Sequence, residues 1–297
     1  MTGMDIMRHP YFNTPRLVVN TRAALFGFAT GKFTLTECLF LLARKFKNPD
    51  TQRKFMDLQR RGIAKFIGEG GSVNLYGHAV YPVTGDPEES FYLIDQIVRQ
   101  NQYRTELIKD GDVVIDAGAN KGIFSIKVAH EFPHAKVYAF EPIHETVVIL
   151  KKNAAPYPNI FCFELGLGDV KASKPMMVDP AGPDGNRMAD AIIDMPEDPG
   201  RNETRNVPVT TIDDFVAERS VPHIDFIKMG VEGYEGKILL GAAKTIRRYK
   251  PTIVMSAYHS KHDVQELPRI LESIQPGYRV KLEKRNELDF VCQYPKR

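Results

Sequence analysis

A glycine-containing turn between two apolar segments is the part of this sequence best suited to bind a ligand. Residues 112–125 read DVVIDAGANKGIFS, in which Asp116, Gly118 and Gly122 have the spacing Asp-x-Gly-x-x-x-Gly. Gly118 permits a tight turn and a close approach of the backbone to a ligand, and Gly122 lets the following helix pack near the strand. The start of that helix offers free N–H donors and the positive end of its dipole. We expect Asp116 to accept from a ligand ammonium group or to position ordered water.

The spacing of this turn separates it from two other glycine loops. It lacks the dinucleotide pattern G-x-G-x-x-G, because positions 120 and 121 are Asn and Lys, and it lacks the G-K-[ST] of a P-loop. A D-x-G-x-x-x-G loop after the first strand is the usual form in proteins that bind S-adenosylmethionine. We therefore predict this cofactor, with Asn120 near its methionine end and Lys121 facing solvent. An NAD-dependent oxidoreductase is the alternative, although the missing dinucleotide pattern argues against it.

A second acidic residue stands where such a cofactor needs one. The predicted second strand ends at Phe140-Glu141-Pro142, and Glu141 follows Asp116 by 25 residues. This is close to the ~20-residue offset at which an acidic side chain holds a ribose hydroxyl pair, at the carboxyl edge of a parallel sheet. Leu165 and Gly166 end the predicted third strand, where the adenine ring rests by analogy with this type of fold.

The elements that position these residues alternate between apolar strands and helices, which indicates an α/β, Rossmann-like and mostly parallel sheet covered on both faces. A terminal antiparallel strand pair is predicted over 278–283 and 288–294, and a hairpin or long insertion over the Gly-, Pro-, Asp- and Asn-rich residues 166–210. The pattern predicts strands over 112–116, 136–140, 160–165, 224–228 and 252–257, and helices over 90–108, 122–132, 143–154, 213–219, 236–248 and 263–274.

Residues 1–85 differ in charge from the rest of the chain. They hold 12 Lys+Arg against 5 Asp+Glu, whereas the remainder holds 28 against 32. We expect a basic, mainly helical region over 1–85, with helices at 34–46 and 51–67 and a β segment at 72–83, followed by a cofactor-binding domain over 86–297. The basic stretch 44–65 contains interleaved phenylalanines. It is either a solvated helix face packed on the main domain or a contact for an anionic surface, and a recruitment or homo-oligomerisation role stays open.

Composition excludes several other classes of protein. The three cysteines, Cys38, Cys162 and Cys292, are far apart and have no C-x-x-C spacing, which argues against structural zinc and a disulfide framework. No stretch reaches the ~20 apolar residues that span a bilayer, and the first residues have no signal-peptide core. We therefore expect a cytoplasmic protein with reduced thiols.

Four segments together resemble the FkbM family of S-adenosylmethionine-dependent methyltransferases: VIDAGANKGIFS, AFEP, VTTIDDF and IDFIKMGVEGYEGKILLGA. The resemblance covers about residues 90–275, and its most specific part is K-x-x-V-E-G-x-E-x-x-(L/I)-x-G-A. It implies methyl transfer to an oxygen of a small-molecule acceptor, such as a sugar or a secondary metabolite. The family usually reads K-I-D-V-E-G, whereas this chain has Gly230 in place of the aspartate. Glu232 and Glu235 are candidates to replace that carboxylate, and a non-catalytic cofactor-binding protein is the alternative.

Candidate catalytic residues follow from the demands of methyl transfer. The reaction is an in-line displacement, so the site must hold donor and acceptor collinear and can also remove the acceptor's proton. Lys228, at the end of the fourth strand, is a candidate to hydrogen-bond an acceptor oxygen, and Glu232 to orient the acceptor. His259 follows the fifth strand and is a candidate general base. The spacing of His259, His262 and Asp263 is too loose for a metal site, so no metal ligand is predicted.

Overall fold

The structure is a computed structural model of the chain. It describes residues 64–66, 72–83, 93–178, 187–188, 203–285 and 287–295. The chain divides into two compact units, Met1–Asp95 and Gln96–Arg297. The boundary between them falls later than the expected one at residue 85. Within the described ranges, no helix has the length and apolar character needed to cross a membrane.

The described part of the first unit is a small antiparallel sheet with the order β1-β2-β3 (Ala64–Phe66, Val73–Leu75 and His78–Val80). The predicted β segment over 72–83 is confirmed, and its turn contains Gly77, whose N–H donates to Asn74 Oδ1. The predicted helix over 51–67 is wrong at its end, because Ala64–Phe66 pairs with β2 and this pairing overrides the local helical pattern. Residues 34–46, and the basic stretch up to residue 63, lie outside the described residues.

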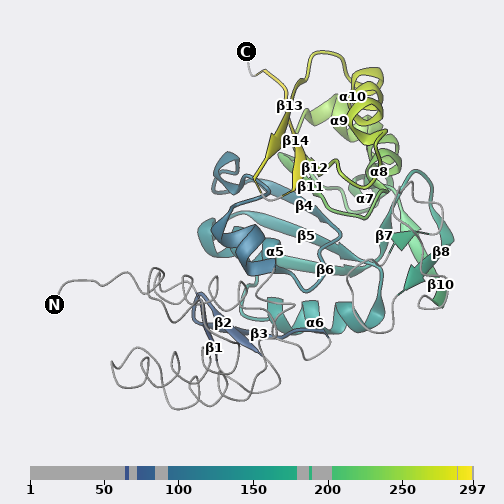
Figure 1. The fold of residues 1–297 in the computed structure, drawn as a ribbon. Coiled ribbons are helices and arrows are strands. Elements are labelled where there is room, and N and C mark those ends of the chain that lie inside the picture. Colours follow the sequence, from purple (N-terminus) through teal and green to yellow (C-terminus); the bar gives the residue numbers. More distant parts are fainter. Residues whose placement is uncertain are drawn as a thin grey trace, which may run out of the picture. The chain divides into compact units, whose positions relative to one another are not determined.

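The second unit is built on a seven-stranded sheet with the order β13-β14-β12-β11-β4-β5-β6 (Figure 1). Its parallel part and its terminal antiparallel pair confirm the predicted Rossmann-like α/β class. The central strand β4 carries the apolar run Val113-Val114-Ile115 and is buried along its whole length, as a parallel strand covered on both faces must be. The strands are β4 (Val113–Ala117), β5 (Lys136–Glu141), β6 (Ile160–Glu164), β11 (Phe226–Met229), β12 (Thr252–Ser256), β13 (Arg279–Lys284) and β14 (Leu288–Gln293).

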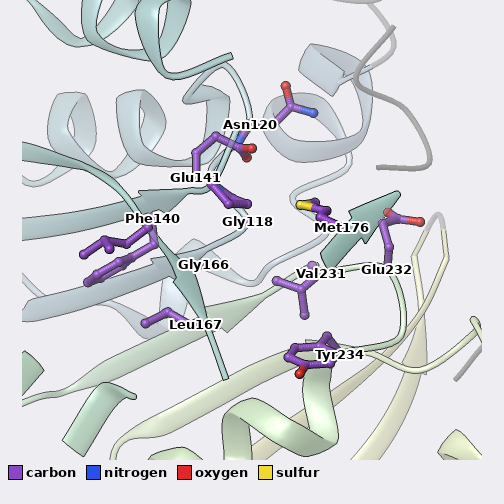
Figure 2. Close-up of a pocket in the computed structure, with 13 residues that line it drawn as sticks. Gly118, Asn120, Phe140, Glu141, Gly166, Leu167, Met176, Val231, Glu232 and Tyr234 are labelled. Atoms are coloured by element: carbon purple, nitrogen blue, oxygen red, sulfur yellow. The ribbon is translucent and has the colours of Figure 1, made fainter. Parts of the chain in front are cut away.

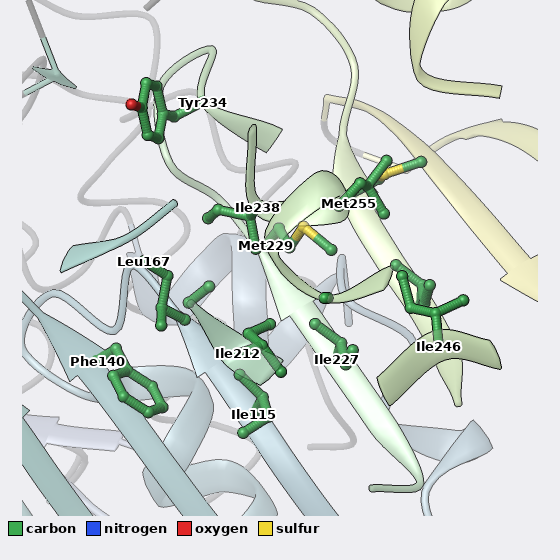
Figure 3. Packing of buried hydrophobic residues seen from close by; sticks show 14 of the residues in the cluster. Ile115, Phe140, Leu167, Ile212, Ile227, Met229, Tyr234, Ile238, Ile246 and Met255 are labelled. Carbon is green, nitrogen blue, oxygen red and sulfur yellow. The ribbon is translucent and has the colours of Figure 1, made fainter. Parts of the chain in front are cut away.

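Alternation along the strands separates the two faces of this sheet. Ile115 and Ile227 point to one face, where they join a hydrophobic core that includes residues of helices α7 to α10 (Figure 3). On the other face Phe226 stacks with Phe124 of α5, with ring centroids 6.2 Å apart. The helices are α5 (Ile123–Glu131), α6 (His144–Ala154), α7 (Ile212–Glu218), α8 (Glu235–Gly241), α9 (Ala243–Tyr249) and α10 (Asp263–Ile274).

The predicted helix over 90–108 is wrong. A short π-helix, η4 (Ile94–Arg99), and a 3-10 turn, η5 (Thr105–Leu107), stand in its place, and Asn101 and Arg104 between them have left-handed backbone angles. The Asn101 side chain accepts from both the N–H and the hydroxyl of Thr105, which favours a turn over a continuous helix. The break lets the polar residues that follow Asn101 turn toward the sheet.

Two other segments refine the predicted pattern. The helix predicted over 236–248 is divided at Ala242 into α8 and α9. Within the hairpin or long insertion predicted over 166–210, β8 (Ala172–Val178) and β10 (Glu203–Thr210) pair antiparallel although β9 (Arg187–Met188) lies between them in sequence. Strands β8 and β10 form a separate small sheet with β7 (Gly166–Leu167) and β9, in the order β7-β10-β8-β9.

The close approach of α8 to the backbone at Gly168 explains the glycine of the L-G-A segment. A Cβ on Gly241 would lie 1.9 Å from the backbone oxygen of Gly168, a group that cannot move aside. We expect Gly241→Ala to destabilise the protein by about 1–3 kcal/mol or more. Gly236→Ala, in the same helix, would meet only the ends of flexible side chains, Ile270 at 3.2 Å and Leu267 at 3.7 Å, and should cost much less than Gly241→Ala.

Urea denaturation of the two variants measures this difference. Equal stability of Gly241→Ala and Gly236→Ala would show that α8 does not approach the Gly168 backbone as described.

Candidate functional site

A pocket opens at the carboxyl edge of the large sheet (Figure 2). It contains about 640 Å³ of space, part of it open to solvent. Most of the predicted cofactor residues line it, together with the predicted catalytic residue Glu232. These cofactor residues are Gly118, Asn120, Glu141, Leu165 and Gly166.

Other lining residues were not predicted from the sequence. Phe140 and Pro142 lie next to Glu141, and Val231 and Tyr234 lie close to Glu232 in sequence. These four residues belong to motifs already identified, so their neighbours could have indicated them as lining residues. Leu167 follows the predicted Gly166. Met176 comes from β8, in a segment without any readable motif. The pocket therefore combines four strand ends with the small sheet.

The glycine loop is shaped by close backbone contacts. Gly118 has a left-handed φ of 71°, and a Cβ there would lie 2.1 Å from the backbone oxygen of Gly230. No side chain fits at Gly118, because the loops after β4 and β11 touch at this point. Gly122, also left-handed, does not line the pocket. A Cβ on it would lie 2.7 Å from Leu150 of α6, so this glycine serves helix packing.

Lys121 departs from the expectation that it faces solvent. Its side chain is fully buried, so that prediction is wrong. Its backbone oxygen accepts a hydrogen bond from Asn153 Nδ2 of α6 at 3.0 Å. Both the side chain and the backbone of Lys121 thus attach the glycine loop to the interior of the unit.

Glu141 presents a buried carboxylate to the pocket. Its Oε2 accepts from the Asn120 N–H at 3.0 Å, and its Oε1 accepts from the Ile143 N–H at 3.2 Å. Burial raises the pKa of Glu141 to about 7, against the opposing effect of these two hydrogen bonds. Each carboxylate oxygen has a second lone pair, so Glu141 retains the capacity to accept hydrogen bonds from a pair of ligand hydroxyls.

Lys228 and Asp116 form a buried ion pair beneath the glycine loop. They are adjacent in the register of β11 and β4, and Lys228 Nζ lies 3.0 Å from Asp116 Oδ1. Lys228 Nζ also donates to the backbone oxygens of Ala117 at 3.1 Å and Gly118 at 2.7 Å. Asp116 Oδ2 accepts from Ser125 of α5 at 2.7 Å. The ammonium group that Asp116 meets is the chain's own, and neither side chain lines the pocket.

Beside the pocket, His259 stands between two glutamates. Its Nδ1 lies 3.6 Å from Glu232 Oε2 and its Nε2 lies 3.7 Å from Glu235 Oε1. His259 and Glu235 are buried, while Glu232 is partly exposed and lines the pocket. Burial lowers the pKa of His259 to about 4 and raises the pKa of Glu235 to about 8. At neutral pH the His259–Glu235 pair therefore carries no net charge.

This arrangement connects the pocket to an internal proton acceptor. Glu232 has a left-handed φ of 55°, an uncommon backbone for a non-glycine residue, which turns it toward the pocket. His259 Nε2 is buried without a hydrogen-bond partner, and Nδ1 is the ring nitrogen that lies near the pocket residue Glu232. In the part of the chain that the structure describes, no cluster of three potential ligands suits a metal ion.

Residues 116–280, more than half of the chain, match the family described as the Methyltransferase FkbM domain. The chain belongs to this family. An NAD-dependent oxidoreductase, the alternative left by the glycine loop, is thereby set aside.

Relatives of this FkbM-family protein come from bacteria and fungi. Methyltransferase 1 of Beauveria bassiana is 24% identical over 220 residues, which cover 69% of this chain and 88% of that protein. The 31-O-demethyl-FK506 methyltransferase FkbM of Streptomyces tacrolimicus is 26% identical over 157 residues, which cover 45% of this chain and 60% of that protein. A crystal structure of methyltransferase FkbM from Methylobacillus flagellatus is 19% identical, with a TM-score of 0.48, and covers 82% of this chain and 59% of that chain.

The AMB antimetabolite synthetase AmbE of Pseudomonas aeruginosa is also similar, at 26% identity over 207 residues. That match covers 59% of this chain, which spans only 10% of the length of the synthetase.

Family membership and fold imply S-adenosylmethionine as the cofactor, and the pocket fits it. Glu141 has free acceptor capacity for the two ribose hydroxyls. Phe140, Leu165 and Leu167 supply apolar wall for an adenine ring. Gly118 and Gly230, whose backbones approach each other closely, both line the pocket. When bound, this cofactor supplies an electrophilic methyl group on a positively charged sulfur.

The ion pair under the loop generates a prediction about stability. Lys228→Met leaves Asp116 as an unpaired buried carboxylate and should cost about 3–5 kcal/mol. Combining it with Asp116→Asn should recover much of this loss. Lys237→Met, which breaks a partly exposed pair with Asp169, should cost less than about 1 kcal/mol. The denaturation midpoints of the wild type, the two single variants and the double variant measure these losses of stability. Equal losses of stability in Lys228→Met and Lys237→Met would contradict the account.

The raised pKa of Glu141 generates a prediction about pH. Ribose hydroxyls bind the ionised carboxylate, so binding must release the proton that Glu141 carries below pH 7. The affinity should therefore fall as the pH drops through 7, approaching tenfold per unit well below it. The suitable probe is 5′-methylthioadenosine, because it carries the ribose but no amino or carboxyl group.

Calorimetry between pH 5.5 and 8.5 measures the slope. Glu141→Gln should bind more weakly at high pH and lose the slope. The same slope in Glu141→Gln would assign the pH dependence to another group.

Proposed function

We propose that this FkbM-family protein transfers the methyl group of S-adenosylmethionine to a hydroxyl oxygen of a small-molecule acceptor, such as a sugar or a secondary metabolite. The observation that carries the proposal is the Glu232–His259–Glu235 group at the edge of the cofactor pocket. A hydroxyl loses its proton when its oxygen is methylated, so the reaction benefits from a proton acceptor beside the acceptor site.

In this proposal the chain's residues divide the work. Glu141 and the apolar wall hold the nucleoside part of the cofactor. Glu232 accepts a hydrogen bond from the acceptor hydroxyl. When the cofactor supplies its methyl group to the acceptor oxygen, the hydroxyl proton would pass to Glu232 and then to Nδ1 of His259. A proton on His259 lies beside the Glu232 carboxylate, 3.6 Å from Nδ1, whose negative charge stabilises the imidazolium ion.

The relatives support an oxygen acceptor without identifying it. The name of the Streptomyces tacrolimicus relative describes methylation at an oxygen of FK506. Met176 of the small sheet and Glu232 of the loop after β11 face the pocket, so these segments are suited to select the acceptor. A cytoplasmic location remains part of this proposal.

Two further predictions from the sequence remain open. Contact of the basic stretch 44–65 with an anionic surface concerns residues largely outside those described, and it predicts binding that weakens steeply with salt. A homo-oligomer also remains a prediction. The alternative function, a non-catalytic cofactor-binding protein, predicts cofactor binding without turnover.

The proposal is tested with S-adenosylmethionine labelled in its methyl group and a panel of sugars, hydroxy acids, phenols and amines. We expect label on a hydroxyl-bearing compound. His259→Asn should lower turnover by about 10²–10⁴-fold at unchanged cofactor affinity, whereas His262→Asn, at an exposed position, should behave as the wild type. Transfer to amines alone would contradict an oxygen acceptor, and cofactor binding with no transfer at all would favour the non-catalytic alternative.

A further inference from the structure

The side chain of Tyr103 occupies the space beside Gly230. Gly230 lines the pocket at the end of β11, and a Cβ added to it would lie 2.6 Å from the Tyr103 hydroxyl oxygen. Real Cβ atoms essentially never approach another atom so closely. The same Cβ would lie 3.5 Å from Lys228 Nζ. Position 230 therefore has no side chain of its own, and a tyrosine hydroxyl from another segment stands there instead.

Tyr103 is held firmly in this position. Its ring packs edge-on against Phe124, with centroids 5.7 Å apart and planes at 84°. Lys228 Nζ lies 5.0 Å from the centroid of the same ring, a cation–π arrangement. The segment that carries Tyr103 turns sharply at Asn101 and Arg104, both left-handed. These contacts place the ring without using its hydroxyl group.

The hydroxyl belongs to a buried polar network. It shares a hydrogen bond with the side chain of Ser256 at the end of β12. Ser256 Oγ in turn donates to Asp289 Oδ1 at 3.4 Å, and Gln102 Nε2 donates to the same oxygen at 3.3 Å. Burial raises the pKa of Asp289 to about 7 and raises the pKa of Tyr103 well above its usual value. Tyr103 thus stays a neutral phenol that both donates and accepts hydrogen bonds.

We propose that Tyr103 is the residue that positions the acceptor hydroxyl at the end of β11, with its own hydroxyl standing where a side chain at position 230 would lie. This inference rests on the proposed function. The Gly230 backbone forms the contact between Tyr103 and the pocket, and Tyr103 retains 8% of its surface exposed. Each hydroxyl has one proton, so Tyr103 donates its own to the acceptor oxygen when Ser256 donates to Tyr103 in place of Asp289.

The first test compares Tyr103→Phe with the wild type, using the hydroxyl acceptor found in the panel. Removing the hydroxyl should lower kcat/KM for the acceptor by about tenfold to a hundredfold, mainly through a higher acceptor KM. The affinity for S-adenosylmethionine should stay within about threefold. Tyr249→Phe is the matched control, because its hydroxyl makes one long contact, 3.5 Å to Val221 O, away from the pocket lining.

The second test is a double-mutant cycle with Gly230→Ala, which needs no acceptor. Gly230→Ala alone should lower the melting temperature and weaken cofactor binding, because its Cβ meets the Tyr103 hydroxyl. In the Tyr103→Phe background the same substitution should be much less harmful, since the clashing oxygen is gone. Methyl transfer should not be restored in the double variant.

The outcomes separate this inference from the proposed function. Wild-type kcat and KM in Tyr103→Phe would overturn the inference alone. Equal harm from Gly230→Ala in both backgrounds would overturn it as well, because Tyr103 would then not fill the space beside Gly230. A wild-type chain that methylates no hydroxyl would overturn the proposed function and this inference with it.

Discussion

The site depends on one interaction, the buried ion pair between Lys228 and Asp116. Two charges taken out of water incur a desolvation cost that their attraction offsets only when the remaining hydrogen-bonding groups are also satisfied. Here Lys228 donates to the Ala117 and Gly118 oxygens and Asp116 Oδ2 accepts from Ser125, while Asp116 Oδ1 is held by the charge of Lys228 at 3.0 Å and has no hydrogen bond. The pair therefore joins β4, β11 and α5 at the point where the glycine loop begins. The close approach of Gly118 to Gly230 depends on the same alignment of the two strand ends.

From this point the pocket extends in two directions. Toward β5, the loop brings the Asn120 N–H to Glu141, which forms the part suited to a nucleoside. Toward β12, the loop after β11 turns Glu232 into the pocket and brings it near His259, which forms the part suited to remove a proton. Glu141 and Glu232 are far apart in sequence and lie at the ends of different strands. The ends of separate parallel strands bring them to one edge, as is general for ligand sites in open α/β sheets.

Short-range patterns predicted much of the fold because each element has a periodic apolar face. The helix over 263–274 was predicted with the bounds of α10, and all the strands of the large sheet were predicted within a few residues. The prediction over 90–108 was wrong because Gln102 and Tyr103 bond side chains on β12 and β14, which no local pattern can indicate. The spacing of the motifs was enough to predict Gly118 and Glu141 as cofactor-binding residues. The burial of Lys228 depends on its register opposite Asp116, a contact between residues far apart in sequence.

The most direct test of the account is a calorimetric titration of the folded chain with S-adenosylmethionine and, separately, with NAD. Since Glu141 is the carboxylate placed to hold a ribose, Glu141→Ala is the matched variant. The account predicts micromolar binding of S-adenosylmethionine by the wild type, loss of that binding in Glu141→Ala, and no binding of NAD. A folded wild-type chain that binds no S-adenosylmethionine, or that binds NAD in its place, would contradict it.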